Sequence, residues 1–366
     1  MRNFLNRYFP QVVEFIRKLK AKKWSENSIV FYVGSRKEPL IPDSLKTGAS
    51  GSYTAVIKLS QEWAKLGYQV TVYSTCDGKA GSYDGVNYVD YCYFNPYDHF
   101  NILIIFQHPY LLPNNFKAKK ICLEWQDVLG NPTTFPPQKI TKFDLIFAKS
   151  QYQRGLMPFI NDKKFVIVTN GVDANISKLA NQPKNPYKLI YASRYYRGLD
   201  SMLTYGWSII KQAIPEAELH IYYGFVRAEL SEDQRLWREN LLKLLQQPGI
   251  FEHGKVGQDE LILAKSSASI HYYACTYEEI DCVSVRESAM VGCVPVTTDY
   301  AVFKEKNYCL KVPGNPKSKE TQVAIANSIV ELLQNPTLLA SLRQEFQDNV
   351  SQETWDHIAK VWVKNF

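Results

Sequence analysis

The sequence lacks any hydrophobic run long enough to cross a bilayer. Its longest uninterrupted run, ILIIF at 102–106, is far shorter than the ~20 apolar residues that a membrane-spanning helix needs. The opening residues MRNFLNRYFP also lack the apolar core of a secretory signal, because Arg7 interrupts them. We therefore expect a cytoplasmic protein.

Cysteine is scarce and scattered. The seven cysteines show no CxxC spacing, which a zinc site or a redox motif would need. Several of them lie inside apolar stretches, where cysteine behaves as a small hydrophobic residue. The sequence predicts free structural thiols and no metal site.

An excess of positive charge is also missing from most of the chain, where Lys and Arg are nearly balanced by Asp and Glu. The net charge is +7, yet residues 1–23 alone hold seven Lys or Arg side chains and one Glu. A nucleic-acid-binding domain would spread its basic residues over a face or groove of the folded body, so nucleic acid is excluded as a partner.

In residues 1–23 apolar side chains recur at helical spacing beside the cations. Such a pattern is typical of a helix that makes peripheral contact with an anionic membrane. A helix that docks on the neighbouring domain and leaves its basic end in solvent produces the same pattern. The sequence leaves both interpretations open.

What the sequence does contain is a regular alternation of short apolar runs and amphipathic helices. Many of the runs are continuous and β-branched, as in strands that are covered on both faces. Predicted strands lie at 28–34, 69–74, 86–94, 101–106, 119–125, 143–150, 164–170, 188–193, 217–224, 249–256, 268–274 and 294–299, and predicted helices at 52–66, 199–213, 231–247, 319–334 and 351–364. This alternation predicts an α/β fold with parallel sheets.

The pattern appears twice, on either side of the polar, proline-containing stretch 181–188, which has the composition of a linker. We therefore predict two Rossmann-like, doubly wound domains that face each other across a cleft. Ligands of open α/β sheets bind beyond the carboxyl ends of the strands, so the cleft is the expected site.

A polar loop with two glycines, TGASGSY at 47–53, precedes the first long helix. Gly48 and Gly51 allow the backbone to approach a ligand closely, and the start of a helix offers N–H groups to an anion. The loop matches neither GxGxxG nor a Walker loop, which argues against dinucleotide oxidoreductases and P-loop enzymes. A plain turn before a helix has the same composition.

Two arginines directly follow a predicted strand in YASRYYRGLD at 191–200. Arg194 and Arg197 are expected at the carboxyl end of that strand. A diphosphate would suit this position, because the planar guanidinium donates to two phosphate oxygens at once. A solvated loop is the alternative.

The most specific motif runs from Tyr272 to Val296, where a strand ends and a helix is predicted to start near Val283. Glu279 and Glu287 lie on either side of that helix start. Their carboxylates can accept hydrogen bonds from sugar or ribose hydroxyls while the helix N–H groups face a phosphate. The helix macrodipole also favours acidic residues here without any ligand.

Together these motifs resemble the retaining GT-B glycosyltransferases of glycosyltransferase family 4. Glu279 and Glu287 fit that family's E-x7-E motif, and Arg194 with Arg197 and Gly198 fits its phosphate clamp. Further segments resemble the family in the right order: VTNGVD at 168–173, FEHGKVGQDEL at 251–261, CVPVTT at 293–298 and the closing WDHIAKVW. The resemblance runs from about residue 28 to the last residue.

The resemblance implies a GT-B fold with an acceptor domain over 24–172 and a donor domain over 173–350. The final helix, 351–366, would pack back on the acceptor domain. The implied reaction moves a sugar from a UDP- or GDP-sugar to a glycan, glycolipid or protein-linked acceptor, with retained anomeric configuration and no required metal or other cofactor.

The resemblance also implies a role for each motif. Glu279 would bind the donor sugar, Glu287 the ribose, and Arg194 and Arg197 the diphosphate. The remaining implied contacts are the backbone N–H groups around Val283 and Ser284 at the phosphate, Gly48, Gly51 and Ser52 approaching it from the first domain, and Lys255 and Val256 near the base.

One stretch departs from the family. Many members have a His-Asp pair after a first-domain strand, whereas this chain has LEWQD at 123–127, with Gln126 before Asp127. Glutamine cannot titrate, so any proton transfer at that position is lost. His108, which follows another strand at the same sheet edge, is an alternative polar group. A packed, non-catalytic histidine is the other interpretation of His108.

Two further functions fit the same motifs. One is a sugar-nucleotide epimerase of GT-B architecture. The other is a non-catalytic sugar-binding or scaffold protein with a degenerate site, which Gln126 makes credible. Tyrosines also cluster at predicted strand ends, among them Tyr223 and Tyr273, and we expect most of them to pack in the core or at its rim.

Overall fold

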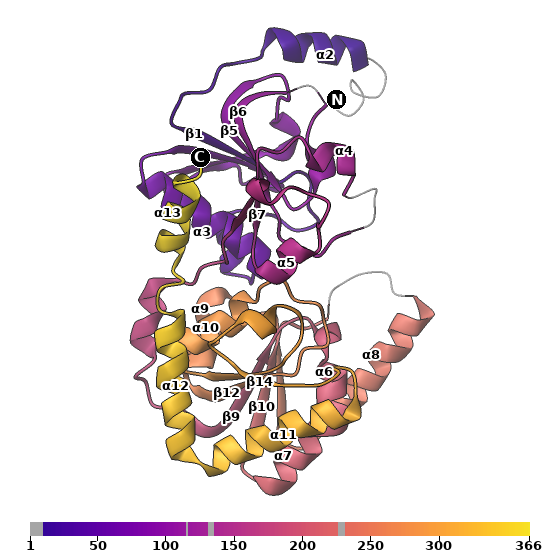
Figure 1. Ribbon diagram of the computed structural model, residues 1–366. Helices are drawn as coiled ribbons and strands as arrows, with labels where there is room; N and C mark the ends of the chain where they lie inside the picture. The colour runs from indigo at the N-terminus through magenta and orange to yellow at the C-terminus, as the bar shows by residue number, and fades with distance from the viewer. Residues whose placement is uncertain (1–9, 115, 131–134, 226–230) are drawn as a thin grey trace. The chain divides into compact units, whose positions relative to one another are not determined.

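The structure, a computed structural model, describes residues 10–114, 116–130, 135–225 and 231–366. The chain divides into two compact units. Unit 1 contains the described residues of Met1–Ser44 together with Ser52–Thr169 and Ile358–Phe366, and unit 2 contains Leu45–Gly51 and Asn170–His357. Each unit is built around one sheet (Figure 1).

Unit 1 holds an eight-stranded sheet in the order β3-β4-β2-β1-β5-β6-β7-β8. Its strands are β1 (Ser28–Tyr32), β2 (Gln69–Ser74), β3 (Gly81–Tyr83), β4 (Val86–Asp90), β5 (His99–Phe106), β6 (Lys117–Glu124), β7 (Leu145–Ala148) and β8 (Phe165–Ile167). β3 pairs antiparallel with β4, and the other neighbours pair in parallel. The central strands β1 and β5 are largely buried, as their continuous apolar runs predict.

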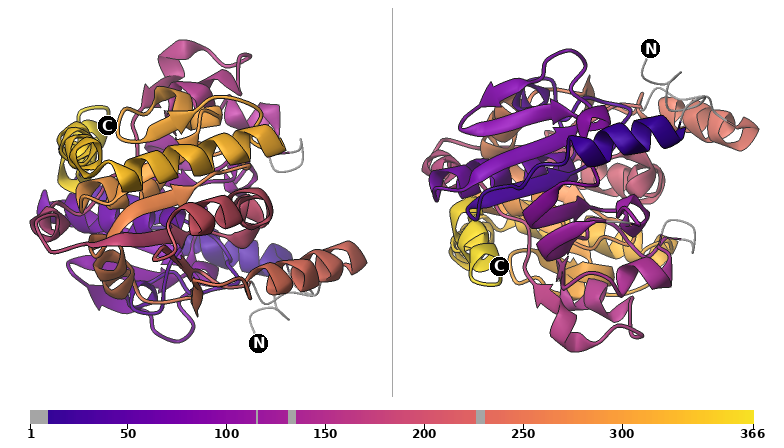
Figure 2. Two further views of the ribbon diagram at one scale, coloured as in Figure 1. Left: turned by 90° about the horizontal axis from the view of Figure 1, so that it is seen from below. Right: turned by 90° about the horizontal axis from the view of Figure 1, so that it is seen from above.

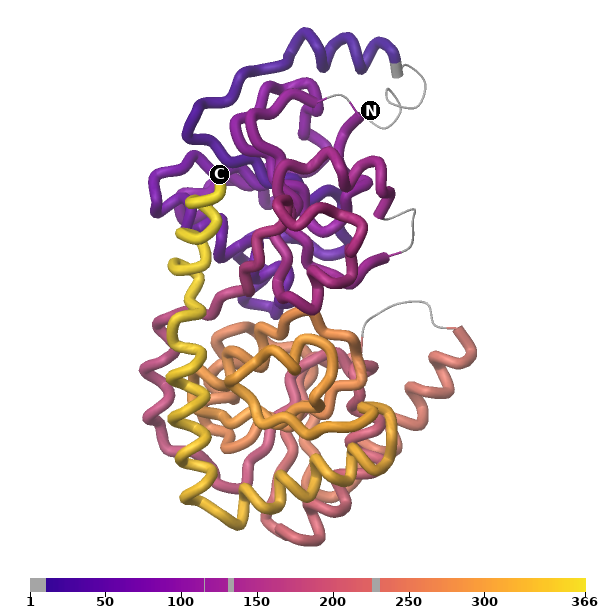
Figure 3. Tube along the Cα trace, viewed as in Figure 1, coloured from indigo at the N-terminus to yellow at the C-terminus, as the bar shows by residue number. Residues whose placement is uncertain are grey.

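The helices of this part of the chain are α2 (Pro10–Leu19), α3 (Gly51–Lys65), α4 (Pro137–Ile140), α5 (Gln151–Gly155) and α13 (Trp355–Val363). Figure 3 follows the yellow end of the chain into unit 1. There Trp362 is fully buried and stacks on Phe147, with 3.3 Å between the ring centroids. Trp362 also meets Trp63 of α3 edge-on at 5.3 Å. The end of α13 is therefore part of the core of unit 1.

Unit 2 holds a six-stranded parallel sheet in the order β11-β10-β9-β12-β13-β14. Its strands are β9 (Asn185–Ala192), β10 (Glu218–Tyr222), β11 (Ile250–Gly254), β12 (Ala268–Tyr273), β13 (Val294–Thr298) and β14 (Leu310–Val312). Its helices are α6 (Leu199–Ser201), a π-helical turn (Met202–Gly206), α7 (Trp207–Ala213), α8 (Glu232–Leu244), α9 (Gln258–Ser266), α10 (Val283–Met290), α11 (Lys319–Gln334) and α12 (Pro336–Val350).

These two sheets confirm the predicted fold class, two doubly wound α/β units. Some boundaries differ from the prediction. The expected linker at 181–188 is wrong in part, because β9 already begins at Asn185. The expected strand 86–94 ends at Asp90, whose side chain accepts a hydrogen bond from the N–H of Cys92 and turns the chain into a 3-10 helix. The predicted helix 199–213 contains a π-helical turn.

Within the described ranges, no helix has the length and apolar composition that crossing a membrane requires. Of the predicted basic segment 1–23, residues 1–9 lie outside the described residues, and the rest forms α2 and the strand-like connection to β1.

Candidate functional site

In unit 2 the loop after β9 carries both predicted arginines. β9 ends at Ala192, and a short 3-10 turn, Tyr195–Arg197, leads to Gly198. Gly198 has φ +112°, and a Cβ there would lie only 2.7 Å from the carbonyl oxygen of Ala274. Only glycine lets the chain pass this close to the end of β12. That passage brings Arg197 beside the loop that carries Glu279.

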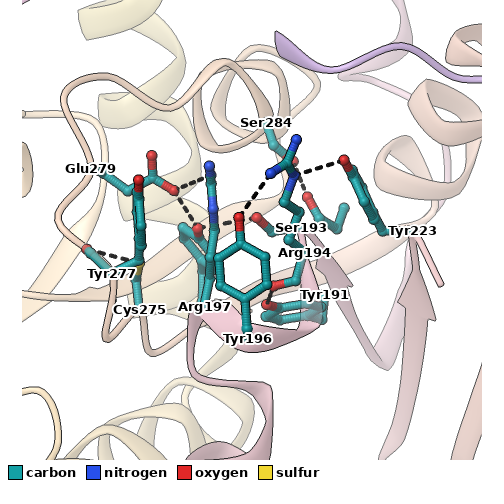
Figure 4. Close-up of polar contacts among 12 residues, drawn as sticks. Tyr191, Ser193, Arg194, Tyr196, Arg197, Tyr223, Cys275, Tyr277, Glu279 and Ser284 are labelled. Carbon is teal, nitrogen blue, oxygen red and sulfur yellow. Dashed lines mark hydrogen bonds and ion pairs between the residues drawn. The ribbon is translucent and has the colours of Figure 1, made fainter. Parts of the chain in front are cut away.

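Arg197 and Glu279 form an ion pair at this edge of the sheet (Figure 4). Arg197 Nη1 donates to Glu279 Oε1 at 2.5 Å, and the Tyr273 hydroxyl donates to the same oxygen at 2.6 Å. Burial raises the pKa of Tyr273 well above its ordinary value, so its hydroxyl keeps the proton that it donates. The Glu279 side chain is 4% exposed and that of Arg197 is 23% exposed. Glu279 is thus fixed in one orientation by two donors.

Part of the hydrogen-bonding capacity of this pair is unused. Within the described residues, the buried Nε of Arg197 has no hydrogen-bond partner. The hydrogen bonds from Arg197 and Tyr273 to Glu279 both end on Oε1. A planar guanidinium and a carboxylate with open lone pairs can take phosphate oxygens and sugar hydroxyls respectively.

Arg194 is held by two tyrosines on the same edge. Its Nε donates to the Tyr223 hydroxyl at 2.9 Å and its Nη1 to the Tyr196 hydroxyl at 2.8 Å, as Figure 4 shows. Tyr223 has φ +112°, a backbone conformation that is strained for a residue with a side chain. The strain occurs where Tyr223 orients a guanidinium, directly after β10.

Glu287 lies one turn inside α10 and is 6% exposed. Its Oε2 accepts from Nζ of Lys265 at 2.6 Å, and its Oε1 accepts from Nε2 of Gln258 at 2.5 Å. Lys265 is fully buried, and its ammonium also donates to the carbonyl oxygen of Ser284. Each carboxylate oxygen has a second lone pair, so Glu287 can still accept from a ribose hydroxyl.

The N-terminus of α10 lies between the two glutamates. Its N-cap residue, Cys282, makes no side-chain capping hydrogen bond, and α10 begins at Val283. The Ser284 hydroxyl donates to the carbonyl oxygen of Ala192 and so ties the first turn of α10 to the end of β9. Uncapped N–H groups at a helix start favour an anion.

The glycine loop belongs to unit 2, although it precedes α3 of unit 1 in sequence. A Cβ on Gly48, which has φ +92°, would lie 2.5 Å from the carbonyl oxygen of Val256 and 3.0 Å from Cγ of Lys255. A Cβ on Gly51 would lie 3.4 Å from the side chain of Val283. The loop therefore lies beside both the predicted base-side residues and the start of α10. Ser52, the next residue, is counted with unit 1.

In unit 1 the predicted polar residues gather at the carboxyl ends of β5 and β6. Asp127 Oδ2 accepts from Nε2 of Gln107 at 2.9 Å. Gln126 Nε2 donates to Glu124 Oε1 at 2.6 Å, and the other oxygen of Glu124 pairs with the buried ammonium of Lys149. Gln126 thus serves as a neutral donor to a buried carboxylate.

His108 lies beside these residues. Its ring stacks on Tyr110, with 5.4 Å between centroids, and its Nδ1 is buried without a hydrogen-bond partner among the described residues. Burial, and the nearby Arg36 guanidinium, lower the pKa of His108 to about 4. His108 is therefore neutral near pH 7 and is a weaker base than an ordinary histidine.

Several residues at these two edges were not predicted. Tyr223 and Tyr273 were expected to pack, and the structure shows their hydroxyls holding Arg194 and Glu279. Lys265 carried no local signal, because its partner Glu287 is on another helix. Arg36, after β1, has buried Nε and Nη2 atoms without partners in the described part of the chain, and it stacks over Phe106.

Solved structures of other proteins share this architecture. Neither a protein-family model nor a curated protein sequence matches the chain. Among solved structures, sucrose-phosphate synthase from Thermosynechococcus elongatus matches with a TM-score of 0.69 at 12% identity, over 92% of this chain and 98% of that one. A glycosyltransferase from Rickettsia africae matches with a TM-score of 0.65 at 13% identity, over 93% and 98%. Anabaena HepE in complex with UDP-glucose gives 0.64 at 13%, over 92% and 98%.

This chain has the GT-B fold. In this GT-B chain the six-stranded unit carries Arg194, Arg197, Glu279 and Glu287, and the eight-stranded unit carries Gln126, Asp127 and His108. Among the described residues of the GT-B chain, no three His, Cys, Asp or Glu side chains come together in a way that would hold a metal ion.

Proposed function

We propose that the chain is a retaining glycosyltransferase of the family 4 type that transfers a sugar from a UDP- or GDP-sugar. The observation that carries the proposal is the fixed Arg197–Glu279–Tyr273 cluster beside the uncapped start of α10. It combines a phosphate-binding fork, a sugar-binding carboxylate and a helix N-terminus at one sheet edge. HepE, which shares the fold, binds UDP-glucose, and this supports a UDP-hexose as the first donor to test.

The geometry suggests how unit 2 would act on such a donor. When the bond between the sugar C1 and the diphosphate breaks, negative charge develops on the departing diphosphate. The Arg194 and Arg197 guanidinium groups and the N–H groups of Val283 and Ser284 would stabilise that charge, which is a large term in catalysis of this kind. Glu279 would orient the donor sugar, Glu287 the ribose, and the loop of Gly48 and Gly51 would leave room for the backbone to approach the phosphates.

We place the acceptor on unit 1. The polar groups at its sheet edge are Asp127, Gln126 and the neutral His108, and the unpaired donors of Arg36 favour an acceptor that offers oxygen atoms to them. The class of acceptor proposed is a glycan, a glycolipid or a protein-linked sugar.

The experiment begins with a thermal-shift screen of UDP-, GDP- and ADP-sugars, because a ligand that binds only the folded state raises its melting temperature. The stabilising donor is then incubated with an acceptor panel, and nucleotide release and product anomeric configuration are measured. Glu279→Gln and Arg197→Met should each lower kcat/KM by about 10²–10³-fold, the usual effect of removing one transition-state contact.

Glu278→Gln, one residue away, is the matched control and should keep most of the activity. Equal activity of the wild type and both site variants would overturn the site assignment. Epimerised sugar nucleotide formed without an acceptor would identify an epimerase instead. Donor binding without turnover on any acceptor would identify a sugar-binding or scaffold protein.

A further inference from the structure

Helix α2 of unit 1 presents a row of large apolar side chains to solvent. Val12, Phe15, Ile16 and Leu19 are 53%, 62%, 43% and 71% exposed. Their spacing places them on one face of the helix. A surface helix normally turns its apolar face inward, and α2 does the opposite.

The opposite, polar face of α2 docks on unit 1 through specific hydrogen bonds. The Tyr97 hydroxyl donates to Glu14 Oε1 at 2.8 Å, and Nδ2 of Asn95 donates to the carbonyl oxygen of Arg17 at 2.9 Å. The Lys18 ammonium lies 5.3 Å from the centroid of the Tyr97 ring. In Figure 1 and in the view from above in Figure 2, α2 lies at the margin of unit 1, with one side toward its strands.

The connection from α2 to β1 is fastened in the same way. Asp98 accepts from the N–H of Lys22 at 3.1 Å and from Nε1 of Trp24 at 2.9 Å. The N–H of His99 donates to the carbonyl oxygen of Lys22 at 2.8 Å. The outward orientation of the apolar row is therefore fixed at both ends of the segment.

The lysines beside the apolar row of α2 indicate which kind of partner would cover the row. Lys18, Lys20, Lys22 and Lys23 are exposed, and the acidic residue of α2, Glu14, is already paired with Lys18. A second copy of α2 would offer these lysines no carboxylate besides Glu14, which is already paired. Anionic lipid headgroups attract these lysines, and the acyl boundary accepts the apolar row.

We propose that α2 is a membrane-surface helix, which holds unit 1 on an anionic bilayer with the Val12, Phe15, Ile16 and Leu19 row immersed at the headgroup–acyl boundary. This partner goes beyond the proposed transfer reaction and does not depend on it. Vesicle binding is measured without donor or acceptor, so the two proposals fail separately.

The test is co-sedimentation of the full chain with phosphatidylcholine vesicles that do or do not contain phosphatidylglycerol. The Phe15→Ser/Leu19→Ser double variant should bind the anionic vesicles at least about tenfold more weakly, because binding scales with the buried apolar area. Both side chains are exposed, so its thermal unfolding should match that of the wild type. The matched control is Phe159→Ser/Leu236→Ser, two side chains 55% and 58% exposed elsewhere, which should bind like the wild type.

A Lys20→Gln/Lys23→Gln variant should lose most of the preference for anionic over neutral vesicles. The proposal is overturned if the wild type does not bind anionic vesicles, or if the control loses as much binding as the α2 variant. It is also overturned if the α2 variant keeps its vesicle binding but has a lower molar mass than the wild type in light scattering. The apolar row would then join two copies of the chain.

Discussion

At the scale of single residues, His108 and Gln126 at the strand ends of unit 1 both stay uncharged near neutral pH. His108 is buried beside the Arg36 guanidinium, and its pKa falls to about 4. Gln126, at the neighbouring strand end, has no proton to lose. Near pH 7 both side chains are therefore uncharged hydrogen-bonding groups, and His108 is a weaker base than an ordinary histidine.

The lowered pKa of His108 predicts a pH effect on stability. The unfolded histidine titrates near pH 6.5, above the folded value, so the unfolded state binds the proton first and the free energy of unfolding falls between pH 6.5 and 4. Relative to His108→Phe, which keeps the stacking on Tyr110, the wild type should lose stability over this range and not above pH 7. Denaturant titrations at several pH values measure the difference.

An NMR titration of the His108 ring gives the pKa directly. A value near 6.5 would contradict the packing described for His108, whatever the denaturation curves show.

At the scale of elements, the start of α10 is anchored by a buried charge cluster. Arg286, fully buried inside α10, binds Asp281 in the preceding loop at 2.7 and 3.0 Å and Glu353 after α12 at 2.5 Å. Lys306 pairs with Asp281 as well. Burial alone would raise the pKa of Asp281, but the Arg286 and Lys306 charges lower it well below its usual range.

We predict that Asp281→Asn lowers the free energy of unfolding of unit 2 by about 3–5 kcal/mol near pH 7, because it leaves buried cations without their partner. A depressed carboxyl pKa stabilises the fold above the unfolded pKa, near 3.9, and the effect disappears as the pH falls toward the folded value. The difference between variant and wild type should thus be constant from pH 7 to 5 and shrink below about pH 4. Chemical denaturation at pH 7, 5 and 3.5 checks this, and a difference that grows in acid would refute the ion-pair argument.

The elements also show what local sequence can and cannot predict. Continuous apolar runs located β1 and the end of β5 well, because strands covered on both faces need no alternation. The three-residue strands β3 and β14 are too short to show any pattern. The start of α12 was missed although its signal is present: Asn335 caps the helix and Pro336 occupies its first position.

The sequence likewise predicted some residues of the candidate site and missed others. Arg194, Arg197, Glu279 and Glu287 were found because each lies in a local motif at a strand or helix end. Tyr273, Lys265 and Arg36 were not, because no local motif marks them. Tyr273 binds Glu279 across the turn that follows β12, and Lys265 binds Glu287 on another helix. Arg36 is notable for buried atoms that have no partner within the described residues. The sequence also could not predict that the apolar row of α2 faces outward, because an amphipathic pattern does not show which face of the helix packs on the protein.

At the scale of the whole molecule, the two units are interleaved in sequence. Leu45–Gly51 belongs to unit 2 although unit 1 flanks it, and Ile358–Phe366 belongs to unit 1 although all of unit 2 precedes it. Trp362 in that last segment fills a buried position against Phe147 and Trp63.

We predict that Trp362→Ala destabilises unit 1 by about 3–5 kcal/mol, the usual cost of removing a buried large aromatic side chain. Trp362→Phe should cost much less, because it keeps the stacking and removes an indole N–H that is buried without a partner in the described residues. Hydrogen exchange measured by mass spectrometry should show faster exchange in β1, β5 and β7 and unchanged exchange in β9 and β12. Trp207→Ala, a buried position in unit 2, should give the reverse pattern, and equal loss in both units would mean that they unfold as one.

The place of Trp362 near the end of the chain determines when the core of unit 1 can be completed during protein synthesis. The ribosome makes most of unit 1 first, together with Leu45–Gly51 of unit 2, then the rest of unit 2, and last the segment that closes the core of unit 1. Domains that emerge early usually fold before later ones are made. In this chain the core of unit 1 cannot close until unit 2 has been translated, and until then Trp63 and Phe147 lack their contacts with Trp362. We therefore expect chaperones to bind nascent chains that stall inside unit 2.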